Sequence, residues 1–264
     1  MVKRKFEPSD ELERLLLELV GMAPSASPQV ADYRSDAIRL KRLADHAEGP
    51  TKYLLYVRSC LRYFEFVAVS DEGVDALATL GSTAEMVEYA AAKAASVTRA
   101  AAASGDVEEL EQYAHLAVLA LRLSAVARMQ RFYLKSDKLK RYFDAVKASE
   151  KARAKADKIR TANQKSGIAA LGAQGPSVAE LREDQGHRQL LVDSSEDALR
   201  AMEHWRAADK LLDEARRVLQ AKGRKTQRLD LLPPVALVHS QEGLADMPQA
   251  VRKSLEDIYF LNSS

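Results

Sequence analysis

The sequence predicts an all-α protein, a helical bundle of about eight helices. Its 264 residues are 47% hydrophobic and 30% charged, which is enough apolar material for one large core or two small ones. Ala, Leu, Glu, Lys and Arg dominate, and apolar residues recur three and four positions apart, as on one face of a helix. The alternating runs that mark strands are almost absent.

The predicted helices follow one another with short interruptions, and two of the pieces are short or weak. Their expected ranges are 9–21, 30–47, 51–69, a short piece at 74–80, 83–103, 106–135, 137–162, a weak helix at 178–184, 195–222 and 247–261.

Turn and capping residues set these boundaries. Gly and Pro end helices, and a hydroxyl or carboxylate side chain followed three residues later by Glu opens them. The interruptions are Gly49-Pro50, Ser82 with Glu85, Ser104-Gly105 before Asp106 with Glu109, Ser136-Asp137, and Pro233-Pro234.

The chain divides by composition into four parts. An N-terminal helix and linker occupy 1–29, and a core of helical hairpins occupies 30–162. Three glycines and a proline in 163–177 predict a flexible linker with a weak helix over 163–194. The helices of 195–264 are expected to pack on the core.

The third predicted helix is unusually aromatic. The chain has nine Tyr, six Phe and one Trp, and five of these lie between Tyr53 and Phe66. Leu54, Val57, Leu61 and Phe64 follow one another at helical spacing, beside a second such stripe that contains Tyr56 and Cys60. A face this wide predicts a buried helix between neighbouring helices, in preference to a platform for stacking bases.

No arrangement typical of catalysis or metal binding is found. The five histidines fall in separate segments, and the single cysteine lies in an apolar run. Glu111 and His115 could share a metal, but such a pair is common on helix surfaces. No enzyme activity and no cofactor are therefore expected. The most apolar run is interrupted by Arg122, Arg128 and Arg131, so no membrane-spanning segment is expected either.

Positive charge is concentrated in two clusters. Residues 135–165 contain eleven basic and four acidic side chains, a net of +7, and residues 215–229 contain no acid. Such clusters suit the phosphates of a nucleic acid, or simply form a solvated helix face. The candidate nucleic-acid-binding residues are Lys138, Lys140, Arg141, Lys151, Arg153, Lys155 and Lys158.

Three segments resemble a known domain. "DAIRLKRLADH" (36–46), "YVRSCLRYFE" (56–65) and "MQRFYLKSDKLKRYFDAV" (129–146) are similar, in the same order, to segments of the C-terminal homology domain of the AFF family of transcription-elongation scaffold proteins. The similarity covers about residues 33–148. The last helices are similar to the end of plant proteins that carry a CW-type zinc finger before the same domain; the matching residues are Ala201, Met202, Glu203, Arg206, Ala207, Lys253, Asp257 and Ile258.

The resemblance implies a tetratricopeptide-like helical bundle, here with helical extensions at both ends, that forms homodimers or heterodimers with a related helical domain. It also implies a place in the nucleus, in transcription elongation or chromatin. The chain departs from these relatives because one cysteine cannot build a CW finger and because the long recruiting scaffold of the AFF proteins is missing.

The function expected from the sequence is therefore a non-catalytic module for protein interaction and dimerisation. Two alternatives remain open: a helical protein that binds nucleic acid through its basic clusters, and a cytoplasmic solenoid-type adaptor that holds peptides. The basic run Lys3–Lys5 fits a nuclear import signal or an ordinary solvated terminus.

Overall fold

The computed structural model describes residues 30–70, 73–165 and 177–224, together with residues 229, 247–249 and 251–252. Within these residues every regular element is a helix, which confirms the predicted all-α class. The long helices are α2 (Val30–His46), α3 (Gly49–Val69), α4 (Gly73–Ser104), α5 (Val107–Lys165) and α6 (Val178–Ala221). The predicted helix 9–21 lies outside the described residues.

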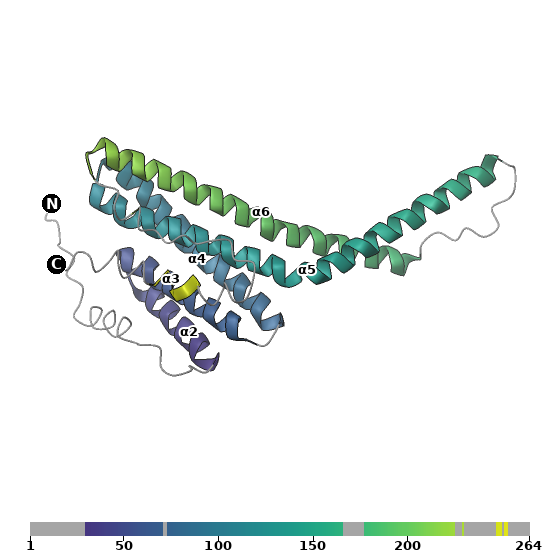
Figure 1. Cartoon of the computed structure of the whole chain (residues 1–264), viewed down its shortest axis with the longest axis horizontal. Coiled ribbons are helices and arrows are strands. Elements are labelled where there is room, and N and C mark those ends of the chain that lie inside the picture. The colour runs from purple at the N-terminus through teal and green to yellow at the C-terminus, as the bar shows by residue number, and fades with distance from the viewer. Residues whose placement is uncertain are drawn as a thin grey trace.

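The molecule consists of a compact body and a projecting arm (Figure 1). In the body, α2 and α3 form one hairpin and α4 and α5 form another, while α6 runs back along α5. We use "arm" for residues 138–165 of α5 and 178–194 of α6, which lie beyond the body; the C-terminal end of α5 projects further than α6. The body carries the core, and the arm exposes most of its surface to solvent.

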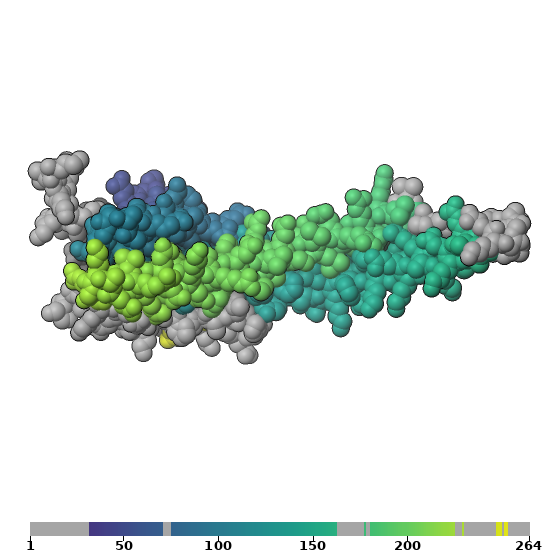
Figure 2. Space-filling view, turned by 90° about the horizontal axis from the view of Figure 1, so that it is seen from above, coloured from purple at the N-terminus to yellow at the C-terminus, as the bar shows by residue number. Residues whose placement is uncertain are grey.

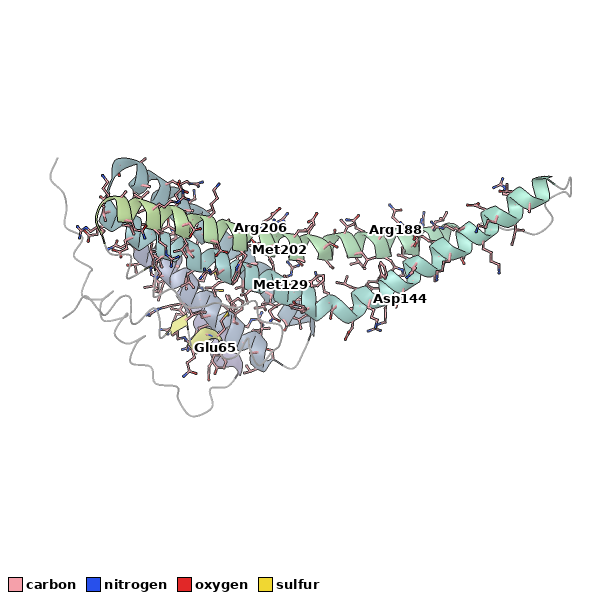
Figure 3. All side chains as sticks on the ribbon, turned by 45° about the horizontal axis from the view of Figure 1, so that its top comes forward. Glu65, Met129, Asp144, Arg188, Met202 and Arg206 are labelled. Carbon is pink, nitrogen blue, oxygen red and sulfur yellow. The ribbon has the colours of Figure 1, made fainter. Side chains whose placement is uncertain are left out.

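Three clusters of buried side chains hold the body together. The first joins α3, α4 and α5 and includes Met247 and Val251 from the C-terminal residues. The second joins α4, α5 and α6, and the third joins α2 to α3 and α4. Glu65 of α3 (Figure 3) also forms ion pairs with Arg62 and Arg252. The described C-terminal residues therefore pack on the first hairpin.

The aromatic helix is buried, as its periodicity predicted. Phe64 and Cys60 of α3 are fully buried, and Phe66 is only 6% exposed. The Tyr56 hydroxyl donates a hydrogen bond of 2.7 Å to Asp45 Oδ1, and burial together with this bond raises the pKa of Tyr56. The tyrosine hydroxyl thereby fastens α3 to α2, as a buried polar group requires.

Helix α4 runs without a break where the sequence predicted two helices. The predicted start at Ser82 is wrong, because its hydroxyl donates to the carbonyls of Ala78 and Thr79 inside the helix. Gly81 lies inside α4 and does not end a helix. A Cβ atom added there would lie 3.3 Å from Cζ of Arg131, so the glycine leaves room for that guanidinium group to cross α4.

Helix α5 is 59 residues long, and its predicted division at Ser136-Asp137 is also wrong. The Asp137 carbonyl accepts a bond from Arg141 within the continuous helix. The preceding boundary is confirmed: α4 ends at Ser104, Gly105 has a φ of 75°, and Asp106 Oδ1 accepts the backbone N–H of Glu109 at 3.1 Å.

Helix α6 extends much further toward its N-terminus than predicted. It is 44 residues long, so the separate helices 178–184 and 195–222 are one helix, and the predicted linker 163–194 is helical from residue 178. Ser177 opens it with a full capping box, in which Ser177 Oγ accepts the Glu180 N–H and Glu180 Oε2 accepts the Ser177 N–H. Residues 166–176 of that linker, and residues 230–246, lie outside the described residues.

Candidate functional site on the body and arm

A buried ion cluster fixes α6 against α5 where the body meets the arm. Asp197 of α6 accepts bonds from Arg128 at 3.2 Å, Arg131 at 3.1 Å and Lys135 at 3.2 Å. The side chains of Asp197 and Arg128 are each only 6% exposed. A single buried carboxylate thus compensates three cations that the same face of α5 presents.

A second carboxylate extends this cluster to α4. Glu88 accepts hydrogen bonds from Arg128 and from Ser124 Oγ, and His204 Nδ1 lies 3.0 Å from the same hydroxyl. Burial lowers the pKa of His204 because it disfavours the charged imidazolium. Burial alone would raise the pKa of Glu88, but the hydrogen bond and charge of Arg128, with smaller contributions from His204 and Ser124, together lower it. The carboxylate is therefore held ionised between three helices.

Ser124, His204 and Glu88 are the residue types of a hydrolytic triad, but their arrangement does not suit nucleophilic attack. Ser124 is fully buried, and its hydroxyl is held by both Glu88 and His204. Among the residues that the structure describes, no group of three or more His, Cys, Asp or Glu side chains is placed to hold a metal ion. His115, expected on a helix surface, is buried.

The ion cluster was not predicted, although the sequence contains a signal for it. Arg128, Arg131 and Lys135 stand three and four residues apart within an apolar helical run. Such cations share one helix face and require a buried acid on a neighbouring helix. The sequence could not identify Asp197, because the partner comes from a helix that begins beyond residue 176.

Lysine side chains line one exposed face of α5 in the arm. At 3.6 residues per turn, spacings of seven, four, four and three keep five of them within roughly a quarter of the helix circumference. We call this set the lysine stripe: Lys140, Lys147, Lys151, Lys155 and Lys158, all exposed. Lys147 was not among the predicted residues, although its distance of seven from Lys140 indicates the shared face.

The other predicted basic residues lie elsewhere. Arg153 faces α6, where its Nη2 binds Asp184 Oδ2 at 2.8 Å, so this guanidinium group belongs to the contact between the helices. Lys138 and Arg141 are exposed. Lys138 lies about 160° around the helix from Lys140, outside the stripe. Between Lys140 and Lys158, the one acidic side chain within the arc of the stripe is that of Asp144, on the side of α5 away from α6 (Figure 3).

The second basic cluster does not join the lysine stripe. Arg217 and Lys222 are at the C-terminal end of α6, which lies at the end of the molecule opposite the tip of the arm (Figure 1). Lys225 and Arg228 lie outside the described residues. The two clusters therefore form separate surfaces.

The outer face of α6 carries exposed apolar side chains along both arm and body. This helix forms a continuous ridge on the surface seen in Figure 2. Leu181 is 44% exposed, Val192 53%, Leu199 59% and Met202 46%. Together with Arg188, Ser195 and Arg206, these four residues follow one another along the helix at steps of seven, four, three, four, three and four. This is the spacing of a coiled-coil contact face. We call these seven residues the outer seam; Arg188, Met202 and Arg206 are labelled in Figure 3.

No known protein family and no curated protein matches this chain. None of the described helices is both long and apolar enough to cross a bilayer, as expected from the arginines that interrupt the most apolar run of the sequence.

Proposed function

We propose that this chain is a non-catalytic interaction module that pairs through the outer seam of α6, with a second copy as its partner. The exposure of Leu181, Val192, Leu199 and Met202 at coiled-coil spacing is the observation that carries the proposal. Isolated exposed apolar residues are common, but four aligned on one helix provide a contact surface for another helix.

The charges beside the outer seam favour an antiparallel pair with twofold symmetry. If the axis passes between Ser195 and Glu196, Val192 lies opposite Leu199 of the second copy. Arg188, which already pairs with Glu150 and Asp184 of its own chain, then lies opposite Glu203 of that copy, and each contact occurs twice, as an isologous interface requires. A parallel alignment would instead bring the two Arg188 side chains together.

Substitution of Leu199 with aspartate is expected to abolish this pairing, because it places a carboxylate at the centre of the apolar contact. Light scattering after size-exclusion chromatography should give the wild-type chain about twice its 29.2 kDa mass at tens of micromolar, and the variant the mass of a monomer.

Leu190→Asp is the matched control. Leu190 is on the same helix and is 45% exposed, but it lies about 160° around the helix from Val192. This variant should remain a dimer. A wild-type chain that is monomeric at every concentration would reject self-association and leave a related helical domain as the partner.

The resemblance to the AFF C-terminal homology domain supports the biological setting that we propose, the nucleus and transcription elongation or chromatin. It also supports a tetratricopeptide-like description of the successive hairpins α2–α3 and α4–α5. The short connections at Ala47-Glu48 and Gly105-Asp106 are compatible with such stacked hairpins.

Nucleic-acid binding is the second candidate, and the lysine stripe favours it. Five ammonium groups on one exposed helix face can follow a phosphate backbone, and the release of counterions would make the affinity depend strongly on salt. This surface lies on α5, whereas the outer seam lies on α6, so the two functions are compatible.

Neutralisation of Lys147, Lys151 and Lys155 with glutamine is expected to weaken binding of a fluorescent single-stranded RNA or duplex DNA at least tenfold at low salt, and to flatten the salt dependence. Fluorescence anisotropy at two salt concentrations measures both effects. The control is the variant with glutamine at Lys210, Arg217 and Lys222. It removes the same charge from the C-terminal part of α6, outside the stripe. Equal losses in both variants would show that the stripe has no special role.

A further inference from the structure

A hollow of about 430 Å³ lies between α5 and α6 in the arm. Small side chains on α5 create it: Ala145, Ser149, Ala152 and Ala156 follow one another at helical spacing on the side that faces α6. Because none of them reaches across, an open groove remains between the two helices that larger side chains would fill in an ordinary helix pair. Its volume is within the range of small-ligand sites, roughly 300–1,000 Å³.

The α6 side of the hollow is acidic. Glu180, Glu183, Asp184 and His187 line it at spacings of three, one and three, so they project from one side of the helix. Arg153 is the one cation in this lining, and with His187 neutral the formal charge is −2. The hollow is therefore negatively charged, whereas the lysine stripe on the same arm is positively charged.

Asp184 gives the hollow a carboxylate in which one of the two oxygens is not used by the described residues. Its side chain is only 8% exposed, and its Oδ2 accepts bonds from Arg153 at 2.8 Å and from Arg188 at 3.3 Å. Its Oδ1 is buried and accepts no hydrogen bond from any described residue. A buried carboxylate oxygen without a donor is costly, so a ligand that donates to it gains a charge-assisted bond.

We propose that this hollow binds the protonated amine of a linear aliphatic ligand, either a free polyamine or a lysine side chain of another polypeptide. An ammonium group carries three donors, enough to reach Asp184 Oδ1 and the flanking carboxylate of Glu183. The methylene chain then lies against Ala152 and Ala156. A metal ion fits less well, because no described group of three ligands has suitable geometry.

Calorimetric titration of the full chain with spermidine at physiological salt tests the proposal. We expect saturable binding of one molecule that Asp184→Asn weakens about tenfold or more, the loss of one charge-assisted bond. Glu183→Gln should weaken it at least about threefold. Its side chain is 73% exposed, so this variant keeps the test valid if Asp184→Asn does not fold.

Glu196→Gln is the control for unspecific attraction, since it removes one exposed carboxylate from α6 outside the hollow. A short capped peptide with one lysine distinguishes the two sources of the amine: binding of spermidine alone assigns a free polyamine, and binding of both assigns the shared ammonium chemistry. The proposal is overturned if neither probe binds saturably, or if Glu196→Gln weakens binding as much as Glu183→Gln.

Discussion

Replacement of Asp197 with alanine is expected to lower the free energy of unfolding by about 3–5 kcal/mol. The substitution leaves Arg128, Arg131 and Lys135 close together with their shared carboxylate removed, and Arg128 is almost fully buried. Arg128 keeps its bond to Glu88, so the loss comes from the three broken bonds to Asp197 and from repulsion among the three cations. Urea denaturation followed by circular dichroism measures the change.

Asp209→Ala is the matched control on the same helix. Asp209 also pairs with an arginine of α5, Arg122, at 3.2 Å, but its side chain is 53% exposed. Exposed pairs of this kind contribute roughly 0–1 kcal/mol. If both variants lost the same stability, burial would not distinguish the two ion pairs, and the ion cluster would have no special part in holding α6.

Replacement of Phe64 with alanine is the second change with a large expected effect, a loss of about 3–5 kcal/mol. Phe64 is fully buried in the cluster where α3 meets α4 and α5. The smaller side chain removes apolar contacts and leaves a cavity in a close-packed core. The same denaturation experiment measures the loss.

Phe143→Ala makes the identical chemical change at an exposed site. Phe143 is 55% exposed on α5 in the arm. Its replacement should change the stability by no more than about 0.5 kcal/mol. A large loss of stability at Phe143 would mean that the ring is buried in a contact that the described residues do not make. A small loss of stability at Phe64 would contradict the central place of α3 in the core.

Local sequence signals predicted the helix ends correctly where a residue acts directly on the backbone next to it. Gly105 ends α4 and Asp106 caps α5 because a left-handed glycine and a capping carboxylate act on their immediate neighbours. The same kind of signal failed at Ser82 and Ser136. Serine caps a helix only when the chain before it leaves the helical conformation. Packing of α4 against α5, and of α5 against α6, keeps the segments around Ser82 and Ser136 helical.

The candidate surfaces were predicted less completely than the core. The sequence identified positive charge in residues 135–165 but treated Arg153 as equivalent to Lys151 and Lys155. Only the position of α6 shows that Arg153 binds Asp184 while the lysines face solvent. A charged residue has the same sequence signal whether it meets water or a partner on another helix, so exposure has to come from the packing.

By itself, the sequence determined that this protein is helical and that the aromatic face of α3 is buried, because helical periodicity and apolar spacing are properties of a single segment. The tertiary structure decided which charges are neutralised, which remain on a surface, and where the hollow forms between the helices of the arm. Those features depend on Asp184 and Asp197 meeting side chains more than thirty residues away in the chain, and no local pattern specifies which distant helix supplies a partner.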